Sequence, residues 1–487
     1  MNKKQQADLW ITEHKGNINE RFRLRYHLMG EVGWVNDPNG FSYYNDYYHL
    51  FYQFNPYHSR WGPMHWGHAI SLDLVKWIHQ EVALAPDSNW DQNGCFSGSA
   101  IVHKNQLDIL YTGHIVANPI EESLQVQNLA ISEDGIHFEK YLNNPVIGAN
   151  QIPEFATKKD FRDPKIIHMD DRYYMLVASM STDGVGQILC YEGPDLTNWG
   201  FLNVFLKGCK ELGKMWECPD LFKLGDTDIL MLSPQYMPRQ DARFNNLHSA
   251  IYILGNSDLK SGVFERTHYY EIDCGFDFYA PQTVTTVDGG IILIAWMDMW
   301  EDPKPTDDLH HGWAGAMTLP RLLSLKNNKI YANPVDSIID YRRNKIEYRN
   351  IHMNGAITIP GFCGSCYELF LELDLTDTKD LIFSSYLRVD QQEYTLLTYT
   401  QCTNTLSLDR NHSGVGLSGK REIIFANSLE SLKLRIFVDI SSIEVFINDG
   451  EYTMTSRIFP SELSQGIEFY TNQDYVVNEI AKWDIIL

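Results

Sequence analysis

The sequence predicts an all-β protein with a five-bladed β-propeller followed by a C-terminal β-sandwich. Two observations support this prediction. Five similar segments begin near residues 37, 97, 163, 218 and 279, about 60 residues apart, and fixed repeats of a similar length are typical of propellers and solenoids. After about residue 345 this spacing stops, and shorter β-type runs separated by turns follow.

Each repeat begins with a predicted β-hairpin, and three repeats open on an acidic residue close to a proline. These openings are Asn-Asp-Pro-Asn-Gly at 36–40, Arg-Asp-Pro-Lys at 162–165 and Glu-Cys-Pro-Asp at 217–220. In each case an apolar run, a polar turn and a second apolar or aromatic run follow. The other two repeats open with Phe-Ser-Gly-Ser at 96–99 and Asp-Phe-Tyr-Ala-Pro at 277–281.

A second pattern lies between the hairpins and combines a polar turn with a large aromatic residue. It occurs at 71–77, 132–138 and 193–199, with a looser copy at 257–264. Such a turn is expected where the outer strand of a blade joins its neighbour. The hairpin, the turn and the aromatic strand give four strands per repeat, which is the content of one propeller blade.

The first strand of each blade lines the central channel of a propeller. The repeats therefore place Asp37, Asp163 and Glu217 at equivalent positions on three inner strands, where their carboxylates should converge at one mouth of the channel. Taken singly, each motif would more often be an ordinary turn. Three acids at matching positions indicate a shared functional site instead.

The C-terminal part predicts a separate antiparallel sandwich. Alternating runs occur at 367–373, 381–387, 394–399, 432–438 and 442–447, with a turn at 448–450. The segment 334–343 is the expected connector and suits a helical turn, and little else in the chain predicts a helix. We expect a propeller domain at 1–343, including an N-terminal extension and the linker, and a sandwich domain at 344–487.

Composition restricts the possible partners. The 487 residues carry a formal net charge of −23, which disfavours nucleic acid and anionic membranes. No run approaches the roughly 18 apolar residues of a membrane helix, and the N-terminus lacks the apolar region of a secretory signal. The eight cysteines are scattered, apart from one Cys-Gly-Ser-Cys at 363–366. We expect them to be reduced, in a cytoplasmic protein.

No metal or other cofactor is expected. His65 and His68 resemble a metal-binding pair, but positions three apart on a strand face opposite sides of a sheet. Cys218 has no evident histidine partner and is expected to pack beside Glu217.

Several motifs resemble those of the β-fructosidases, glycoside hydrolase family 32. They are the three acidic motifs, Phe-Ser-Gly-Ser at 96–99, Gln-Phe-Asn-Pro at 53–56, Trp-Gly-Pro-Met-His-Trp-Gly-His at 61–68, Asp-Phe-Tyr-Ala-Pro-Gln at 277–282 and the segment 439–450. The resemblance runs in order along nearly the whole chain and implies the same propeller and sandwich. Val35 is a small departure, because many members carry Met there.

Retaining cleavage of a glycoside uses a carboxylate nucleophile and a carboxylic acid that later acts as a base, about 5–5.5 Å apart. The resemblance assigns Asp37 as the nucleophile and Glu217 as the acid/base. It assigns Asp163 to two fructose hydroxyls and to the oxocarbenium-like transition state, with Arg162 as its electrostatic neighbour. The side chains implied to hold the fructosyl ring are Asn36, Gln53, Trp61, Phe96, Ser97, Arg162 and Asp277.

The implied partner is a small sugar, and the implied reaction is hydrolysis of sucrose or sucrose 6-phosphate through a covalent fructosyl-enzyme. A cytoplasmic location favours sucrose 6-phosphate, the product of phosphorylating transport, over polymeric fructans. Hydrolysis of short fructo-oligosaccharides and fructosyl transfer remain open. Two other classes are alternatives: an inverting arabinan- or xylan-cleaving glycosidase on the same scaffold, and a fructan-binding lectin. The complete acidic motifs disfavour both.

Overall fold

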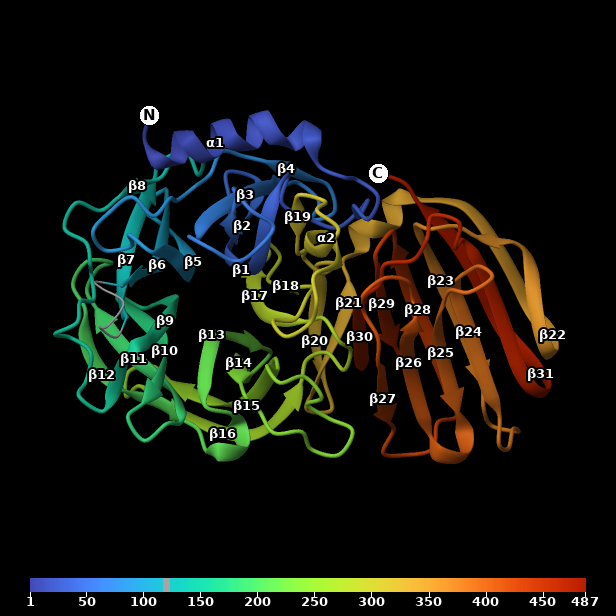
Figure 1. The fold of residues 1–487 in the computed structure, drawn as a ribbon. Coiled ribbons are helices and arrows are strands. Elements are labelled where there is room, and N and C mark those ends of the chain that lie inside the picture. Colours follow the sequence, from blue (N-terminus) through green and yellow to red (C-terminus); the bar gives the residue numbers. More distant parts are fainter. Residues whose placement is uncertain (117–122) are drawn as a thin grey trace.

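Five antiparallel sheets surround a central axis, and a larger antiparallel unit lies beside them (Figure 1). The computed structural model describes residues 1–116 and 123–487. The five sheets are the predicted blades, which confirms the propeller. A short strand, β19 (Trp313–Ala314), pairs in parallel with the first strand of blade 1, so the chain returns from the last blade to the first and closes the ring.

Each blade has four strands in chain order from the axis outward. Blade 1 contains β1 (Gly33–Tyr44), β2 (Tyr47–Asn55), β3 (His65–Ser71) and β4 (Trp77–His79), and blade 2 contains β5 (Gly94–His103), β6 (Gln106–Ile115), β7 (Leu124–Ser132) and β8 (Glu139–Lys140). Blade 3 contains β9 (Ala156–Met169), β10 (Arg172–Ser181), β11 (Gly186–Gly193) and β12 (Gly200–Lys207). Blade 4 contains β13 (Met215–Leu224), β14 (Thr227–Gln235), β15 (Ile251–Asp258) and β16 (Val263–Glu271), and blade 5 contains β17 (Tyr279–Thr285), β18 (Ile291–Trp296), β20 (Arg321–Lys326) and β21 (Lys329–Pro334).

Neighbouring inner strands are joined by polar side chains all the way round the axis. The links are Asn39 Oδ1 to Gly98 N (3.2 Å), Ser99 Oγ to Pro164 O (2.7 Å) and Ile166 N (2.9 Å), Lys165 Nζ to Asp220 Oδ1 (2.7 Å), Asp220 Oδ2 to Thr283 N (2.7 Å), and Gln282 to Phe41 N (3.4 Å) and Gly98 O (2.8 Å). Most of these groups are buried, and a buried polar group needs its partner. The links therefore fix the height of each blade relative to the next.

Every inner strand also carries a β-bulge. The register shifts lie between Val35 and Pro38, Phe96 and Gly98, Arg162 and Lys165, Glu217 and Asp220, and Tyr279 and Gln282. In three strands the second bulged residue is a proline, which has no N–H to lose from the ladder. The residue before that proline has positive φ: +59° at Asp163, +49° at Cys218 and +51° at Ala280.

The bulges correct one detail of the repeat argument. Arg162 and Glu217 both occupy the last paired position before a bulge, whereas Asp163 and Cys218 occupy the first bulged position. Asp37 is the second bulged residue of its strand. The three acids are therefore not at equivalent strand positions, because a bulge inserts residues that spacing from a proline does not reveal.

The predicted outer turns join the third and fourth strands of the first four blades. The Oδ1 atoms of Asp73, Asp134, Asp195 and Asp258 each accept hydrogen bonds from the backbone N–H groups two and three residues ahead. These are the side-chain-capped turns that the sequence predicts.

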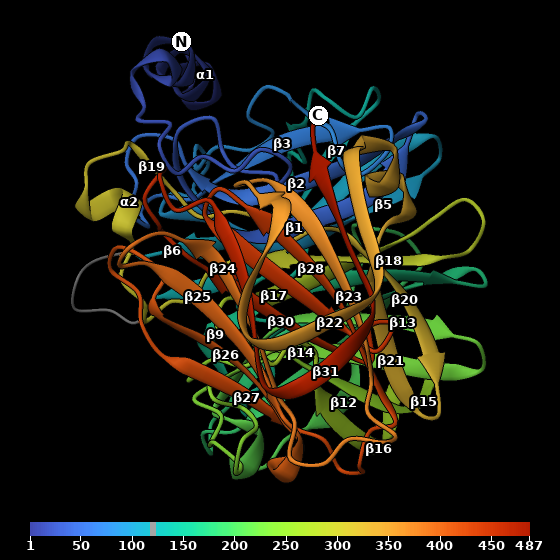
Figure 2. The same cartoon turned by 90° about the vertical axis from the view of Figure 1, so that its right-hand side faces the viewer.

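The C-terminal unit is antiparallel, as predicted, and covers one side of the propeller (Figure 2). Its strands are β22 (Arg342–Cys363), β23 (Tyr367–Asp374), β24 (Ile382–Val389), β25 (Tyr394–Thr400), β26 (Thr405–His412), β27 (Lys420–Ile424), β28 (Ser431–Asp439), β29 (Ser442–Ile447), β30 (Tyr452–Arg457) and β31 (Gly466–Ile485). The first part of β31 pairs with β24 and its last part with β23, while β22 runs along its other edge. These two long strands therefore connect both halves of the sandwich.

Helix α1 (Lys3–His14) was not predicted. A capping box between Asn2 and Gln5 starts it, and Asp8 Oδ1 accepts from Val82 N (2.9 Å), which docks the helix on blade 1. The other helical pieces are α2 (Pro305–Asp308), η1 (Lys15–Asn17), η2 (Lys210–Leu212), η3 (Asp336–Tyr341) and η4 (Gln401–Thr403). None of the helices in the described part of the chain is long and apolar enough to cross a membrane.

A buried charged network joins the propeller to the sandwich. Arg321 pairs with Asp273 (3.0 Å) and with Glu444 of the sandwich (2.6 Å). His27 lies between Glu444 (2.9 Å) and Asp439 (2.8 Å). Burial alone would lower the pKa of His27, but hydrogen bonds to both carboxylates raise it to about 9. His27 is therefore protonated at neutral pH in the folded protein.

The His27 contact predicts a loss of stability at alkaline pH. An unfolded histidine titrates near 6.5, so the contribution is complete below about pH 6.5 and is lost as pH rises through about 9. It is on the order of 3 kcal/mol. Between about pH 6.5 and pH 9, the Tm of the wild type, measured by calorimetry, should fall more than the Tm of His27→Gln. Parallel Tm curves would contradict a protonated His27.

Candidate active site

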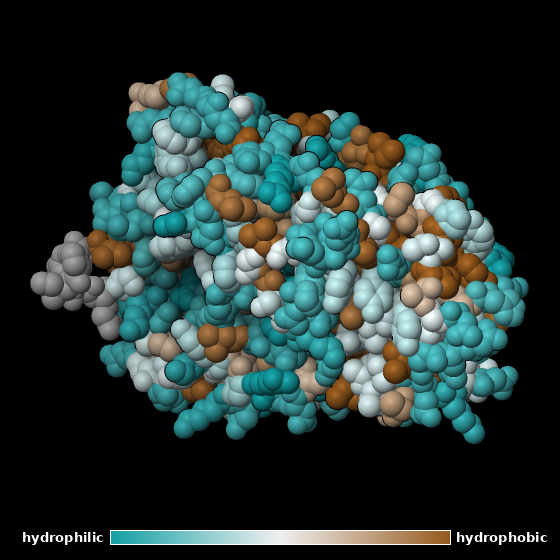
Figure 3. Space-filling view, turned by 45° about the vertical axis from the view of Figure 1, so that its right-hand side comes forward, coloured by the Kyte–Doolittle hydropathy of each residue, from teal (hydrophilic) through white to brown (hydrophobic). Residues whose placement is uncertain are grey.

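A cleft of about 360 Å³ lies where four of the inner strands present their bulges. Seen from outside, the propeller half of the molecule has a hollow among mostly hydrophilic residues (Figure 3). The side chains that line the cleft are Asn36, Asp37, Gln53, Trp61, Phe96, Ser97, His114, Gln125, Lys159, Asp160, Arg162, Asp163, Glu217 and Trp300. All the site residues predicted from the sequence, except Asp277, are in this set.

Asp37 lies in the bulge of β1, with one oxygen tied to blade 2. Its Oδ2 accepts a hydrogen bond from Ser97 Oγ (3.1 Å), while Oδ1 is buried without a hydrogen-bond partner. Burial, followed by the charges of Glu217 and Asp163, raises the pKa of Asp37 to about 7. Hydrogen bonds from Asn36 and Ser97 act in the opposite direction. The carboxylate cluster therefore holds a proton close to neutral pH.

Asp163 is fixed through two backbone groups. Its own N–H donates to Thr112 Oγ1 (2.9 Å), and its Oδ2 accepts from Cys218 N (3.0 Å). Burial raises the pKa of Asp163 to about 6, although Arg162 opposes this effect. A left-handed backbone in a residue other than glycine is uncommon and is often found at functional sites. The bulge thus holds this carboxylate in a set orientation.

Glu217 is oriented by two neighbouring strands. Arg162 donates two hydrogen bonds to Oε1, from Nε (3.1 Å) and Nη2 (3.0 Å), and Tyr279 OH donates to Oε2 (2.6 Å). Arg162 Nη1 also contacts Asp160 (3.0 Å) and Gln125 (3.3 Å). The guanidinium is therefore bound to both Glu217 and Asp160, and it cannot turn toward a ligand without releasing Glu217.

Cys218 does more than the packing that the sequence predicted. Its Sγ lies 3.7 Å from Asp163 Oδ2 and 3.9 Å from Asp37 Oδ2. Burial, with the charges of these two carboxylates, raises the pKa of the thiol well above its usual range, so it stays neutral. A neutral, weakly donating group between two acids separates them without adding charge.

Aromatic rings form one wall of the cleft. Phe96 stacks on His114 with ring centroids 4.4 Å apart, and Trp61 meets Phe96 edge-on at 6.1 Å. Behind them, Trp34 Nε1 donates to Asn36 Oδ1 (2.8 Å), which fixes that amide. A polar floor with an aromatic wall suits a sugar, which has both hydroxyl groups and apolar faces.

Asp277 lies outside the cleft. It is fully buried, and its Oδ2 accepts from Arg410 Nη1 (2.8 Å) and from Arg457 N (2.7 Å), both in the sandwich. Burial raises the pKa of Asp277 to about 6, against the effect of Arg410. Its position therefore makes it an interdomain contact rather than a residue that faces the sugar.

Sequence reasoning missed five cleft residues. They are His114, Gln125, Lys159, Asp160 and Trp300. Asp160 could have been found, because it lies two residues before Arg162 on one strand and so faces the same side. His114 and Gln125 come from β6 and β7, where polar residues among apolar ones resemble ordinary blade positions.

His65 and His68, which resemble a metal-binding pair in the sequence, have separate environments. His65 Nδ1 lies 3.0 Å from Pro63 O, and His68 Nε2 lies 3.1 Å from His49 Nδ1. Within residues 1–116 and 123–487, no three His, Cys, Asp or Glu side chains are grouped so as to hold a metal ion.

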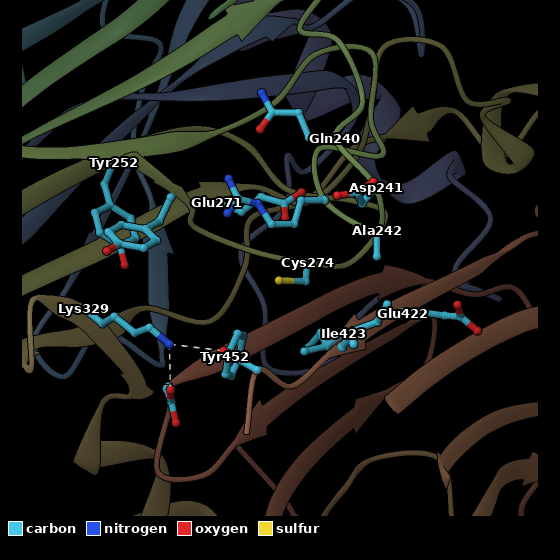
Figure 4. Close-up of a pocket in the computed structure, with 15 residues that line it drawn as sticks. Gln240, Asp241, Ala242, Tyr252, Glu271, Cys274, Lys329, Glu422, Ile423 and Tyr452 are labelled. Atoms are coloured by element: carbon cyan, nitrogen blue, oxygen red, sulfur yellow. Dashed lines mark hydrogen bonds and ion pairs between the residues drawn. The ribbon is translucent and has the colours of Figure 1, made fainter. Parts of the chain in front are cut away.

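A larger cavity, about 560 Å³, lies between the propeller and the sandwich (Figure 4). Lys329 at its edge pairs with Glu451 (2.9 Å) and Tyr452 OH (3.2 Å), and Glu271 accepts from Phe244 N (2.6 Å). Its lining does not include Asp37, Asp163 or Glu217. The cleft, and not this cavity, is therefore the candidate active site.

A five-bladed propeller with three carboxylates gathered on its inner strands is the architecture of a glycoside hydrolase. Residues 27–334 match the family model of the glycosyl hydrolases family 32 N-terminal domain, and residues 338–484 match that of the family 32 C-terminal domain. The chain belongs to glycosyl hydrolase family 32 and is a glycoside hydrolase.

Similar proteins match along nearly their whole length. The chain is 37% identical to a sucrose-6-phosphate hydrolase of Escherichia coli over 481 residues, 98% of this chain and 97% of the relative. It is 37% identical to an Escherichia coli raffinose invertase, with 94% of each covered. Among solved structures, a Bombyx mori GH32 β-fructofuranosidase has a TM-score of 0.88 at 35% identity, covering 99% of this chain and 98% of that one. A Lactobacillus gasseri sucrose-6-phosphate hydrolase has a TM-score of 0.89 at 28% identity, covering 100% and 98%.

The causes of the raised Asp37 pKa predict opposite effects of two substitutions. Asp163→Asn removes a charge that raises the pKa, so the acid limb of the kcat/KM profile should move to lower pH, by roughly one unit. Ser97→Ala removes a hydrogen bond that lowers the pKa, so the limb should move to higher pH. The pH of the acid limb is measured for each variant from its pH–rate profile, which does not depend on the absolute rate. Because the acids titrate together, the limb belongs to the cluster. Shifts in the same direction would contradict this account.

Proposed function

We propose that the protein is a retaining β-fructofuranosidase that hydrolyses sucrose and sucrose 6-phosphate to fructose and glucose or glucose 6-phosphate. The observation that carries the proposal is the meeting of Asp37, Asp163 and Glu217 in one cleft, with Glu217 oriented by Arg162 and Tyr279. The relatives support it. They include sucrose-6-phosphate hydrolases and a Bombyx mori β-fructofuranosidase solved in complex with sucrose, 34% identical with a TM-score of 0.88 and covering 100% of this chain and 99% of that one.

In the first step the Asp37 carboxylate attacks the anomeric carbon of the fructosyl unit while Glu217 gives its proton to the leaving-group oxygen. The glycosidic bond breaks, and a covalent fructosyl-Asp37 forms. In the second step Glu217 removes a proton from water, the water attacks the same carbon, and Asp37 is released.

Asp163 supports the charge that develops on the sugar ring. An oxocarbenium-like transition state is positive, and a fixed carboxylate stabilises it more than the neutral ground state. The backbone contact from Cys218 N keeps Asp163 from turning away. Asn36, Gln53 and Ser97 lie around the same floor and supply partners for hydroxyl groups.

A phosphorylated leaving group requires a cation near the acid/base. Arg162 is engaged with Glu217 and Asp160. Burial, and to a smaller extent Arg162, lowers the pKa of His114 to about 4, so His114 is neutral at pH 7. Lys159 lines the cleft on the same strand as Arg162. Its positive charge and its place in the cleft wall are the grounds on which we assign the phosphate contact to Lys159.

The proposal includes a cytoplasmic location. All eight cysteines are free thiols, including the exposed Cys363 and Cys402. Thiols in this state are typical of proteins in a reducing compartment, whereas secreted proteins commonly form disulfides. A cytoplasmic enzyme would meet imported, phosphorylated sucrose.

Substitution of either reacting carboxylate should abolish most turnover while the protein stays folded. Glu217→Gln should lower kcat by about 10²–10⁴-fold, the usual value of general acid catalysis, and Asp37→Asn by more. Steady-state rates and thermal unfolding measure both effects. The matched control is Asp108→Asn on β6. Asp108 is buried outside the cleft, and burial raises its pKa to about 7. The activity of the Asp108→Asn enzyme should differ from that of the wild type by no more than roughly twofold.

Two results would contradict these roles. One is Asp37→Asn activity within about tenfold of the wild type. The other is initial release of α-fructose, followed by NMR before mutarotation, because a double displacement at Asp37 must release the β-furanose first.

The phosphate assignment predicts a substrate-specific defect. Lys159→Gln should lower kcat/KM for sucrose 6-phosphate by about tenfold or more, the usual effect of losing a charge-assisted contact, and leave that for sucrose within roughly twofold. Lys158→Gln, at the exposed neighbouring position, is the control and should change neither. Equal effects of Lys159→Gln on the two substrates would contradict the assignment. A wild type that prefers sucrose would make this a general β-fructofuranosidase.

A further inference from the structure

The aromatic wall of the cleft is carried by a loop rather than by a strand. Trp61 lies in the connection between β2 and β3, and 49% of its surface is exposed. A half-exposed tryptophan that lines a cleft has little packing of its own to hold it, so the loop must fix its place. The contacts of the residues just before Trp61 are therefore decisive.

Those residues are tied to a single carboxylate on a distant segment. Asp307 Oδ1 accepts from Ser59 Oγ (2.5 Å), and Asp307 Oδ2 accepts from Arg60 Nε (2.6 Å). The loop is held from its other side by Asn55, whose Nδ2 donates to Arg60 O (2.9 Å). Gly62 leaves room for this contact, since a Cβ there would lie 2.6 Å from Asn55 Nδ2. Trp61 thus directly follows a residue whose side chain and carbonyl group are both hydrogen-bonded. We call the contacts of Asp307 with Ser59 and Arg60 the clamp.

The Asp307 carboxylate is itself well anchored. It is 8% exposed, although the Arg60 side chain that it binds is 66% exposed. Asp307 belongs to α2, in the segment between β18 and β19 that also carries Trp300 of the cleft. Lys304 braces that segment by donating to Met299 O (2.6 Å) and Asp302 O (2.5 Å). One braced segment therefore sets the places of both tryptophans.

We propose that Asp307 is a positioning residue for the active site, which acts through Ser59 and Arg60 to hold Trp61 at the sugar. The inference rests on the proposed function, because it requires that the cleft bind a fructosyl unit. Asp307 does not line the cleft and touches no reacting atom. Its effect must therefore pass through Trp61.

The test is a double-mutant cycle on sucrose. Asp307→Asn keeps an acceptor for Ser59 but removes the charge that Arg60 meets, and it should raise KM by roughly tenfold with a smaller change in kcat, because misplacement of a binding group weakens positioning. In a Trp61→Ala background the same substitution should have little further effect on kcat/KM. Effects of Asp307→Asn and Trp61→Ala that multiply would overturn the proposal, as would an unchanged KM. Asp308→Asn, at the exposed neighbouring acid, is the matched control and should leave both constants unchanged.

A second readout does not depend on turnover. Trypsin cleaves after arginine, and the clamp protects the Arg60–Trp61 bond. Asp307→Asn should speed cleavage at this bond, identified by mass spectrometry, and saturating fructose should slow it again. Arg60→Lys, which keeps a charge but loses the geometry of the guanidinium, should give an intermediate KM. If the wild type hydrolyses no β-fructoside, the proposed function fails while the cleavage result still tests the clamp. Unchanged cleavage in Asp307→Asn would overturn the clamp itself.

Discussion

The closed circuit of side-chain contacts between the inner strands determines where every bulge lies. Within residues 1–116 and 123–487, the short β19 pairing is the only strand ladder between adjacent blades, and a single backbone bridge joins Met64 to Gly94, so the relative heights of the blades depend mainly on side chains. Buried groups such as Asn39, Ser99 and Asp220 have their partners only in one register, and an unpaired group would cost about 1–3 kcal/mol. This requirement aligns the blades, and the aligned bulges bring the acids together.

The same alignment concentrates negative charge, and the surroundings offset it only in part. Arg162 faces Glu217, the backbone N–H of Cys218 faces Asp163, and Ser97 faces Asp37. Burial still raises the pKa of Asp37 and of Asp163. A flexible protein would separate such groups, whereas the bulged strands hold them in place. The result suits glycoside cleavage, which needs one carboxyl group ionised and another protonated at the same pH.

Local repetition made the propeller and its acids predictable. Each hairpin and each outer turn carries its own signal, so one blade confirms the next. What the sequence did not show depends on contacts between distant segments. Asp277 follows the repeat pattern, but its carboxylate is taken by Arg410, 133 residues away. Helix α1 has a capping box and yet buries only Ala7, so it lacks the apolar stripe by which helices are recognised. The register of Glu217 against Asp163 depends on bulges that spacing alone does not reveal.

Arg410 shows how the sandwich contributes to a cleft that it does not line. Its guanidinium joins Asp277, beside the fifth inner strand, to Asp302, in the segment that carries Trp300 and Asp307 (2.8 and 2.6 Å). Arg410 is buried and stacks over Phe276 at 3.8 Å, so its pair with the buried Asp277 is shielded from solvent, whereas the Asp302 side chain is 30% exposed. A buried pair costs several kcal/mol to break by removing one partner. The sandwich thus braces, through Arg410, the segment that holds the aromatic wall.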